Sequence, residues 1–296
     1  MDDRSAPCKA LVLAGGGARG SYQVGVWRAL MELDWHPQII TGTSVGSLNG
    51  AMFVLDQYET ARDMWLAIRS KDVMELPEED ADLSALHQFL RSVVKAGGMG
   101  CPTIKPWNKE AVFEKLDILN SKGIFAAAMD IDGAGLPFLK AMNPNAGSKT
   151  VEEMREIIGY AKMPFIIKGI MTPAGALKAV EAGAKAIVVS NHGGRVQGGV
   201  PSTAEVLPAI AEAVKGKITI LVDGGIRSGV DVFRAIALGA DGVLIGRPML
   251  TMIYGGGEEG FKVYMNKLVG ELKSTMTMCG AASLKDISRD MIWLGK

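Results

Sequence analysis

Residues 187–195 read Ile-Val-Val-Ser-Asn-His-Gly-Gly-Arg, an apolar run that ends in small, polar and basic residues. The apolar part predicts a buried strand, and the glycines predict a sharp turn directly after it. The same order recurs at 165–169, 220–229 and 243–248, where each apolar run is followed by glycine and by Lys or Arg. Amphipathic stretches such as 174–182 and 230–238 lie between such runs. We therefore expect parallel strands joined by right-handed helical crossovers.

The whole chain carries eight candidate strands of this kind. They are expected at 10–13, 38–41, 103–105, 124–129, 164–168, 186–189, 218–222 and 242–245. Eight strand–helix units are the number found in a (β/α)8 or TIM barrel. An open doubly wound sheet, or one sheet beside a barrel fragment, is the alternative, because the strand count does not distinguish them. The expected fold class is α/β, with about six TIM-barrel-type units after a two-strand segment that either does or does not complete the barrel.

Composition excludes several classes of protein. Hydrophobic residues make up 48% of the 296 residues and charged residues 22%, which excludes global disorder. Lys and Arg number 32 and balance 32 Asp and Glu, so the basic surface typical of nucleic-acid binding is not expected. No apolar run reaches the ~18 residues of a membrane span, and we find no secretion signal. Cys8, Cys101 and Cys279 lie too far apart for a metal motif and predict a reduced, cytoplasmic setting.

A change of pattern near residue 100 divides the chain. Residues 96–102 read Ala-Gly-Gly-Met-Gly-Cys-Pro and carry no periodicity. We expect one segment at 1–99 and a second at 100–296.

The first segment contains two glycine-rich turns between a strand and a helix. In the first, residues 11–20, backbone N–H groups are expected to point at whatever is bound at the helix N-terminus. The second, Gly42-Thr-Ser44-Val-Gly46, permits a tight turn that would expose the Ser44 hydroxyl before a helix at 47–55.

Together these motifs resemble the patatin-like phospholipase family over residues 8–98. The resemblance implies an acyl-ester hydrolase in which Ser44 is the nucleophile and the oxyanion loop is formed by Gly15, Gly16, Gly17 and Arg19. Asp223, in Asp-Gly-Gly, is a doubtful match to the family's catalytic Asp. A serine without a base is a weak nucleophile, so hydrolysis of a lipid ester is the alternative function.

In the second segment, basic side chains follow several strands. Arg227 and Arg247 come after the last two glycine turns, where β/α barrels commonly bind phosphate. Lys168, His192 and Arg195 would project over the same barrel mouth. An imidazole beside a guanidinium suits proton abstraction from a substrate that carries a carboxylate.

Residues from about 101 to the C-terminus closely resemble the FMN-dependent α-hydroxy-acid dehydrogenase/oxidase family, with Ser190–Arg195 as its signature. The resemblance implies FMN as cofactor and a small 2-hydroxy acid as substrate. It makes His192 the base, Arg195 the carboxylate anchor and Lys168 the cation beside the flavin, and it brings Asp132 near the base. The implied cofactor-binding residues are Thr103, Asp130, Lys168, Ser190, Asp223, Gly224, Gly225, Arg227, Gly246 and Arg247, with Lys105 near Thr103.

The family's N-terminal portion, with its first two barrel strands, has no counterpart in this sequence. The patatin-like segment stands in its place, so its two strands are candidates to fill a hybrid barrel. A non-catalytic fusion of two incomplete sites is the third functional alternative. No metal site is expected, and the oligomeric state stays open.

Overall fold

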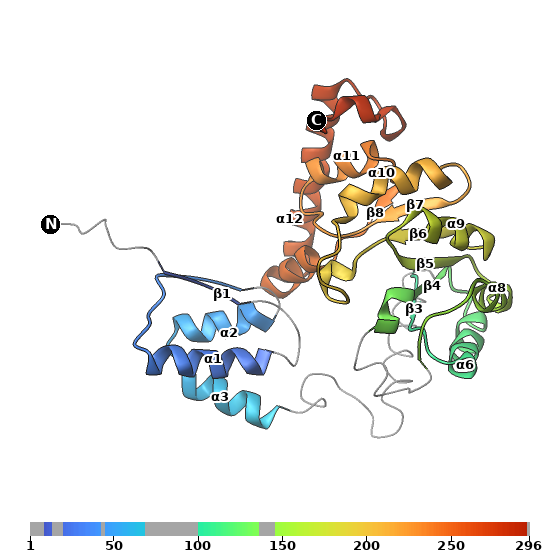
Figure 1. The fold of residues 1–296 in the computed structure, drawn as a ribbon. Coiled ribbons are helices and arrows are strands. Elements are labelled where there is room, and N and C mark those ends of the chain that lie inside the picture. The colour runs from blue at the N-terminus through green and yellow to red at the C-terminus, as the bar shows by residue number, and fades with distance from the viewer. Residues whose placement is uncertain (1–8, 14–19, 43–44, 69–99, 136–145, 295–296) are drawn as a thin grey trace. The chain divides into compact units, whose positions relative to one another are not determined.

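The structure, a computed structural model, describes residues 9–13, 20–42, 45–68, 100–135 and 146–294 (Figure 1). These residues fall into two compact units. The described part of the first unit is 9–13, 20–42, 45–68 and 246–258, and that of the second is 100–135, 146–245 and 259–294. The expected boundary near residue 100 follows a stretch, 69–99, that lies outside the described residues.

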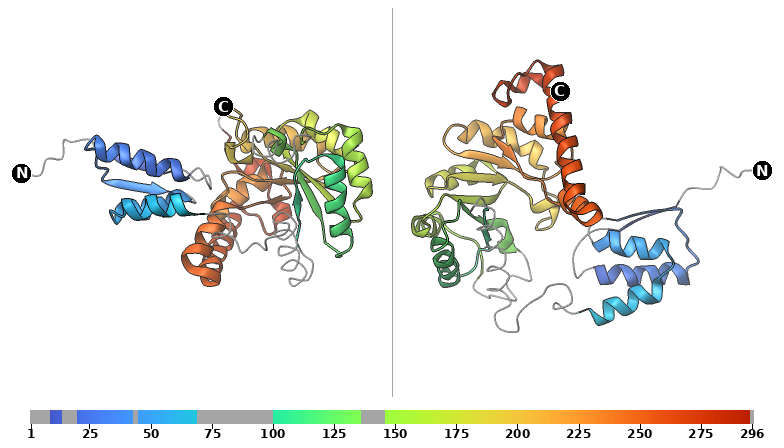
Figure 2. Two further views of the ribbon diagram at one scale, coloured as in Figure 1. Left: turned by 90° about the horizontal axis from the view of Figure 1, so that it is seen from below. Right: turned by 180° about the vertical axis from the view of Figure 1, so that it is seen from behind.

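The first unit is a two-stranded parallel sheet with helices on one face (Figures 1 and 2). Strands β1 (Ala10–Leu13) and β2 (Ile39–Gly42) pair in register from Ala10 with Ile39. The helices are α1 (Gly20–Glu32), α2 (Val45–Val54) and α3 (Tyr58–Ala67). Trp27 is 3% exposed and stacks on Phe53 with ring centroids 4.5 Å apart, which makes it the centre of a small core.

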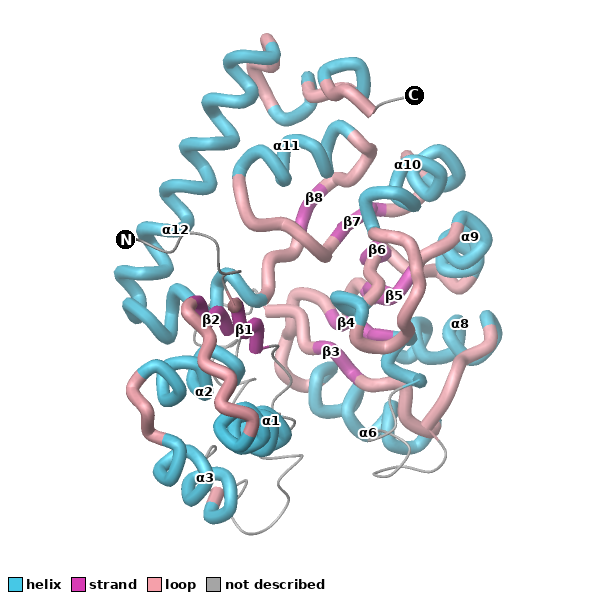
Figure 3. The backbone as a smooth tube through the Cα atoms, turned by 60° about the vertical axis from the view of Figure 1, so that its left-hand side comes forward, coloured by secondary structure: helices cyan, strands magenta, loops and turns pink. Residues whose placement is uncertain are grey.

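The second unit is built on a six-stranded, all-parallel sheet in the order β3-β4-β5-β6-β7-β8. Its strands are β3 (Thr103–Ile104), β4 (Ala127–Asp130), β5 (Phe165–Ile170), β6 (Ala186–Val189), β7 (Thr219–Val222) and β8 (Gly242–Val243). Each strand pairs with the next in the chain, as right-handed β/α crossovers produce. Figure 3 shows these strands inside an arc of helices.

Five helices lie between these strands, and all but α6 begin at a side-chain cap. They are α6 (Lys109–Asn120), α8 (Val151–Tyr160), α9 (Pro173–Glu181), α10 (Thr203–Val214) and α11 (Gly229–Ala237). Thr150, Ser202 and Ser228 each form a capping box with an acidic residue three positions later, which satisfies backbone N–H groups at the helix start. The last helix, α12 (Arg247–Cys279), is interrupted at Gly256 and Gly257 by non-helical backbone.

The core of the second unit lies between the sheet and these helices. Met129, Ile167, Val189 and Val222, from four successive strands, belong to the same buried cluster as helical residues such as Leu116 of α6. Because side chains alternate between faces along a strand, the neighbouring positions point away from the helices. The functional candidates of β4 to β7 occupy that other face.

The expected parallel β/α organisation is confirmed, and all eight strands form within a few residues of their predicted bounds. Within the described residues β1 and β2 pair only with each other, so the hybrid barrel in which they join the larger sheet is wrong. The six-stranded sheet is likewise not closed by pairing between β3 and β8 in the part that the structure describes. No helix there is long and apolar enough to span a bilayer.

Candidate functional site

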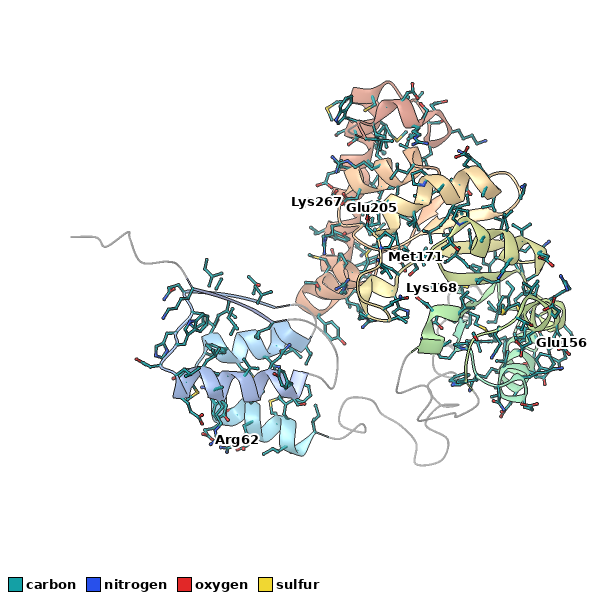
Figure 4. The ribbon with its side chains drawn as sticks, in the orientation of Figure 1. Arg62, Glu156, Lys168, Met171, Glu205 and Lys267 are labelled. Atoms are coloured by element: carbon teal, nitrogen blue, oxygen red, sulfur yellow. The ribbon has the colours of Figure 1, made fainter. Side chains whose placement is uncertain are left out.

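The carboxyl ends of β4 to β7 present charged and polar side chains on the face opposite the helices. Asp130 ends β4, and its Cα pairs with that of Lys168 in β5. Ser190 and Asp223 directly follow β6 and β7. Lys168, labelled in Figure 4, is the cation at the centre of this set. Its Nζ lies 3.8 Å from Oδ2 of both Asp132 and Asp223, close enough for attraction but too long for a hydrogen bond.

Asp132 links Lys168 to His192. It lies in the 3-10 helix η2 (Ile131–Gly135) that follows β4. Its Oδ2 is 3.1 Å from Nδ1 of His192, and both side chains are mostly buried, at 12% and 15% exposure. An imidazole that donates Nδ1–H to a carboxylate keeps Nε2 as an acceptor, which is the form a general base needs.

The turn that carries His192 has an unusual backbone. His192, Gly193 and Gly194 all have positive φ, of 56°, 65° and 73°. This left-handed region is costly for a residue with a Cβ. Neighbouring side chains hold the turn in place, since Ser190 Oγ accepts the N–H of His192 and Asn191 Oδ1 accepts that of Gly194. The strained turn is therefore built into the end of β6.

Gly169 makes room for Asp132. Its φ of +100° coincides with an irregularity in the pairing of β5 with β6. A Cβ at this position would lie 2.7 Å from Cβ and Cγ of Asp132. Only glycine fits this bulge without displacing the carboxylate.

A second ion pair lies beside the first. Lys105, directly after β3, places Nζ 2.5 Å from Oδ2 of Asp130, whose side chain is 4% exposed. Asp130, Asp132 and His192 each offer one atom within 4.8 Å of the others, a spacing that would also suit a metal ion. The ammonium groups of Lys105 and Lys168 already compensate these carboxylates, which argues against a metal.

The segment after β7 combines an acidic side chain with two exposed glycines. Thr203 Oγ1 donates a 2.6 Å hydrogen bond to the carbonyl of Asp223. Gly224 and Gly225 follow with φ of +89° and +79°. A Cβ on Gly224 would come within 3.1 Å of Thr203 Oγ1, so this approach also favours glycine. Arg227 completes the segment with an exposed side chain.

The structure thus brings together Lys105, Asp130, Asp132, Lys168, His192 and Asp223. Arg195, in the turn after β6, and Thr103, the first residue of β3, are both exposed. Gly246 follows β8 and Arg247 begins α12, both within the first unit. Ser44 and the expected oxyanion loop of Gly15, Gly16, Gly17 and Arg19 lie outside the described residues.

Three residues that shape the candidate site were not predicted from the sequence. They are Gly169, Asn191 and Thr203, which shape the turns around Asp132, His192 and Asp223. A glycine inside an apolar strand signals a bulge, so Gly169 was detectable. Asn191 and Thr203 carry no such signal, because their partners depend on the folded loops.

Comparison with known proteins shows the family of the chain. The profile of the FMN-dependent dehydrogenases matches residues 93–294, most of the chain. The chain belongs to the FMN-dependent dehydrogenase family. Structures of mandelate oxidase align with a TM-score of 0.60 at 30% identity, over 68% of this chain and 64% of theirs. The profile of patatin-like phospholipases matches residues 11–155 and overlaps the first match.

Curated relatives match about half of this chain. An L-lactate dehydrogenase of Pectobacterium atrosepticum is 52% identical over 141 residues, which are 48% of this chain and 36% of the relative. One of Xanthobacter autotrophicus is 47% identical over 150 residues, 51% of this chain and 38% of the relative. The chain thus spans less than two fifths of the length of these relatives.

The strand-end residues fit FMN, the cofactor of this family. The buried Oδ1 atoms of Asp130, Asp132 and Asp223 have no hydrogen-bond partner among the described residues. Buried acceptors of this kind are costly unless a donor reaches them, and FMN offers ribityl hydroxyls and a ring N–H. Lys168 and Arg227 are the cations that would face the flavin ring and the phosphate.

Proposed function

We propose that this chain binds FMN at the carboxyl ends of β4 to β7 and oxidises a small 2-hydroxy acid to the 2-oxo acid. The observation that carries the proposal is the Asp132–His192 contact of 3.1 Å beside the Lys168 ammonium. A base held by a carboxylate, next to a cation that can face a reduced flavin, is what this oxidation requires.

Each residue has a distinct task in the proposed reaction. Nε2 of His192 takes the proton of the substrate hydroxyl, and Asp132 holds the resulting imidazolium by charge and hydrogen bond. The exposed guanidinium of Arg195 binds the substrate carboxylate. Bound FMN would supply the acceptor for the hydride that leaves the substrate α-carbon as the C=O bond forms. The Lys168 ammonium would stabilise the negative charge of the reduced flavin.

The related proteins point to the substrates that should be tried. Their names include L-lactate dehydrogenase and mandelate oxidase. L-Lactate and (S)-mandelate are therefore the first candidates, with oxygen and an artificial dye compared as electron acceptors.

The test of cofactor binding uses the full chain. The purified protein is incubated with FMN, separated from free flavin and examined for retained visible absorption. We expect retained flavin in the wild type and a clear loss of affinity in Lys168→Met and Asp223→Asn. A chain that retains no flavin at any FMN concentration rejects the proposal.

The patatin-like match supports ester hydrolysis as a second candidate function. It requires Ser44 as nucleophile, and Asp223, the suggested partner, faces Lys168 at 3.8 Å. Turnover of a chromogenic ester that disappears in Ser44→Ala would support this candidate. Turnover that survives the substitution would exclude it, and absence of both flavin binding and hydrolysis would favour a non-catalytic fusion.

A further inference from the structure

The C-terminal part of α12 packs directly on the start of α11. A Cβ on Gly229 would lie 2.2 Å from the backbone N of Leu272 and 2.3 Å from the backbone O of Leu268. The two helix backbones therefore touch at Gly229, which is the first residue of α11 and follows Arg227 by two positions. This contact fixes the segment that comes after β7.

Two side chains of α12 hold the backbone of this segment. Tyr264 is 8% exposed, and its hydroxyl donates a 2.8 Å hydrogen bond to the carbonyl of Arg227. Burial raises the pKa of Tyr264, with Glu271 and Asp231 adding to the effect, so the hydroxyl keeps its proton. Glu271 Oε2 accepts the N–H of Gly229 at 2.9 Å. Its Oε1 lies 3.7 Å from Nζ of Lys267, which Figure 4 labels on α12.

Protein carboxylates already occupy the N-terminus of α11. Asp231 Oδ2 accepts the N–H groups of Arg227 and Ser228, and Glu271 takes the next one. A helix N-terminus usually attracts anions, but here its donors are satisfied from within the protein. An added phosphate is consequently directed to the exposed Gly224–Arg227 segment before the helix.

We propose that Tyr264 and Glu271 are positioning residues that hold Arg227 for the phosphate of FMN. This inference rests on the proposed function. Both backbone polar groups of Arg227 are fixed, by Tyr264 and Asp231, while its side chain is exposed. Because the backbone of Arg227 is already ordered, binding of the phosphate to its guanidinium does not cost the entropy of ordering that backbone.

The experiment compares FMN with riboflavin, which lacks the phosphate. Affinities for both flavins are measured by quenching of flavin fluorescence on titration with the full apoprotein. We expect Tyr264→Phe and Glu271→Ala to weaken FMN binding about tenfold, or about 1.4 kcal/mol, and to leave riboflavin binding unchanged. Glu271→Gln keeps an acceptor for Gly229 and should retain most of the wild-type FMN affinity. Tyr160→Phe, which removes from α8 a hydroxyl bonded to Asp117 of α6, is the control.

The outcomes separate this inference from the proposed function. If Tyr264→Phe and Glu271→Ala lower the affinities for FMN and riboflavin equally, the two residues only support the fold and the inference is wrong. Wild-type affinity for FMN in both variants would also overturn it. If the wild type and both variants all bind FMN more tightly than riboflavin by the same factor, the inference is wrong but the proposed function is not affected. A wild type that binds neither flavin overturns both. Melting curves of each variant establish that the titrated protein is folded.

Discussion

Asp132 Oδ2 lies 3.1 Å from Nδ1 of His192, although 60 residues separate them in the chain. The contact forms because η2 and the turn after β6 both extend from the same edge of the sheet. The carboxylate orients the ring by accepting a hydrogen bond from it, so the pair acts as a unit in the proposed reaction.

Removing either member of this pair should slow chemistry far more than it weakens binding of the cofactor. We expect His192→Ala and Asp132→Asn to lower the rate of flavin reduction by about 10²- to 10⁴-fold, the usual contribution of a general base. Stopped-flow measurement under anaerobic conditions provides the rate, and fluorescence titration provides the FMN affinity. Near-wild-type reduction in both variants would show that another group takes the proton.

Gly169→Ala should displace Asp132, because the added Cβ would come within 2.7 Å of its side chain. We expect a loss of about 1–3 kcal/mol in the free energy of unfolding, together with slower flavin reduction. Gly183→Ala is the matched control, since Gly183 also has positive φ, at 91°, but its Cβ would meet only Ile158 at 3.9 Å. Equal rates of flavin reduction in the two variants would count against the role assigned to Gly169.

The Lys105–Asp130 pair should show coupling in a double-mutant cycle. Lys105→Met leaves a buried carboxylate uncompensated and should cost about 1–3 kcal/mol of unfolding free energy. Adding Asp130→Asn removes that charge, so the double variant should be more stable than the sum of the single changes predicts. Additive losses in urea denaturation would show that the two groups do not interact.

Cys101 should react slowly with alkylating reagents in the folded protein. Burial raises the pKa of its thiol to about 11. At pH 8 only about one thiol in a thousand is then ionised, against about a quarter for an exposed cysteine. In a variant with Cys8 and Cys279 replaced by serine, we expect labelling by iodoacetamide to be at least tenfold faster in urea than in buffer. Equal rates would contradict the burial of Cys101.

The sequence predicted the strands well because the alternation of apolar runs and glycine turns is local. Ala10–Leu13 and Ala186–Val189 form as expected, and the other strands shift by a few residues. The bulge at Gly169 and the short pairing of β8 account for part of the differences. That β1 and β2 pair only with each other in the described residues was not predictable, because the apolar pattern of a strand does not show which other strand it pairs with.

The site was predictable residue by residue only through resemblance to a known family. Period-two alternation places Asp130, Lys168, Ser190 and Asp223 on one face, but it does not say which of them meet. The Lys105–Asp130 pair and the contact of Tyr264 with Arg227 depend on register and on helix packing. Both interactions join residues far apart in the chain, which local patterns do not reveal.

Oxidation of a 2-hydroxy acid by this chain can be observed by anaerobic mixing of the FMN-loaded full chain with L-lactate or (S)-mandelate while the visible flavin absorption is recorded. We expect loss of the oxidised flavin bands with one of these acids and formation of the matching 2-oxo acid, with almost no change in His192→Ala. A loaded chain whose flavin stays oxidised with every 2-hydroxy acid, or is reduced equally fast without His192, would contradict it.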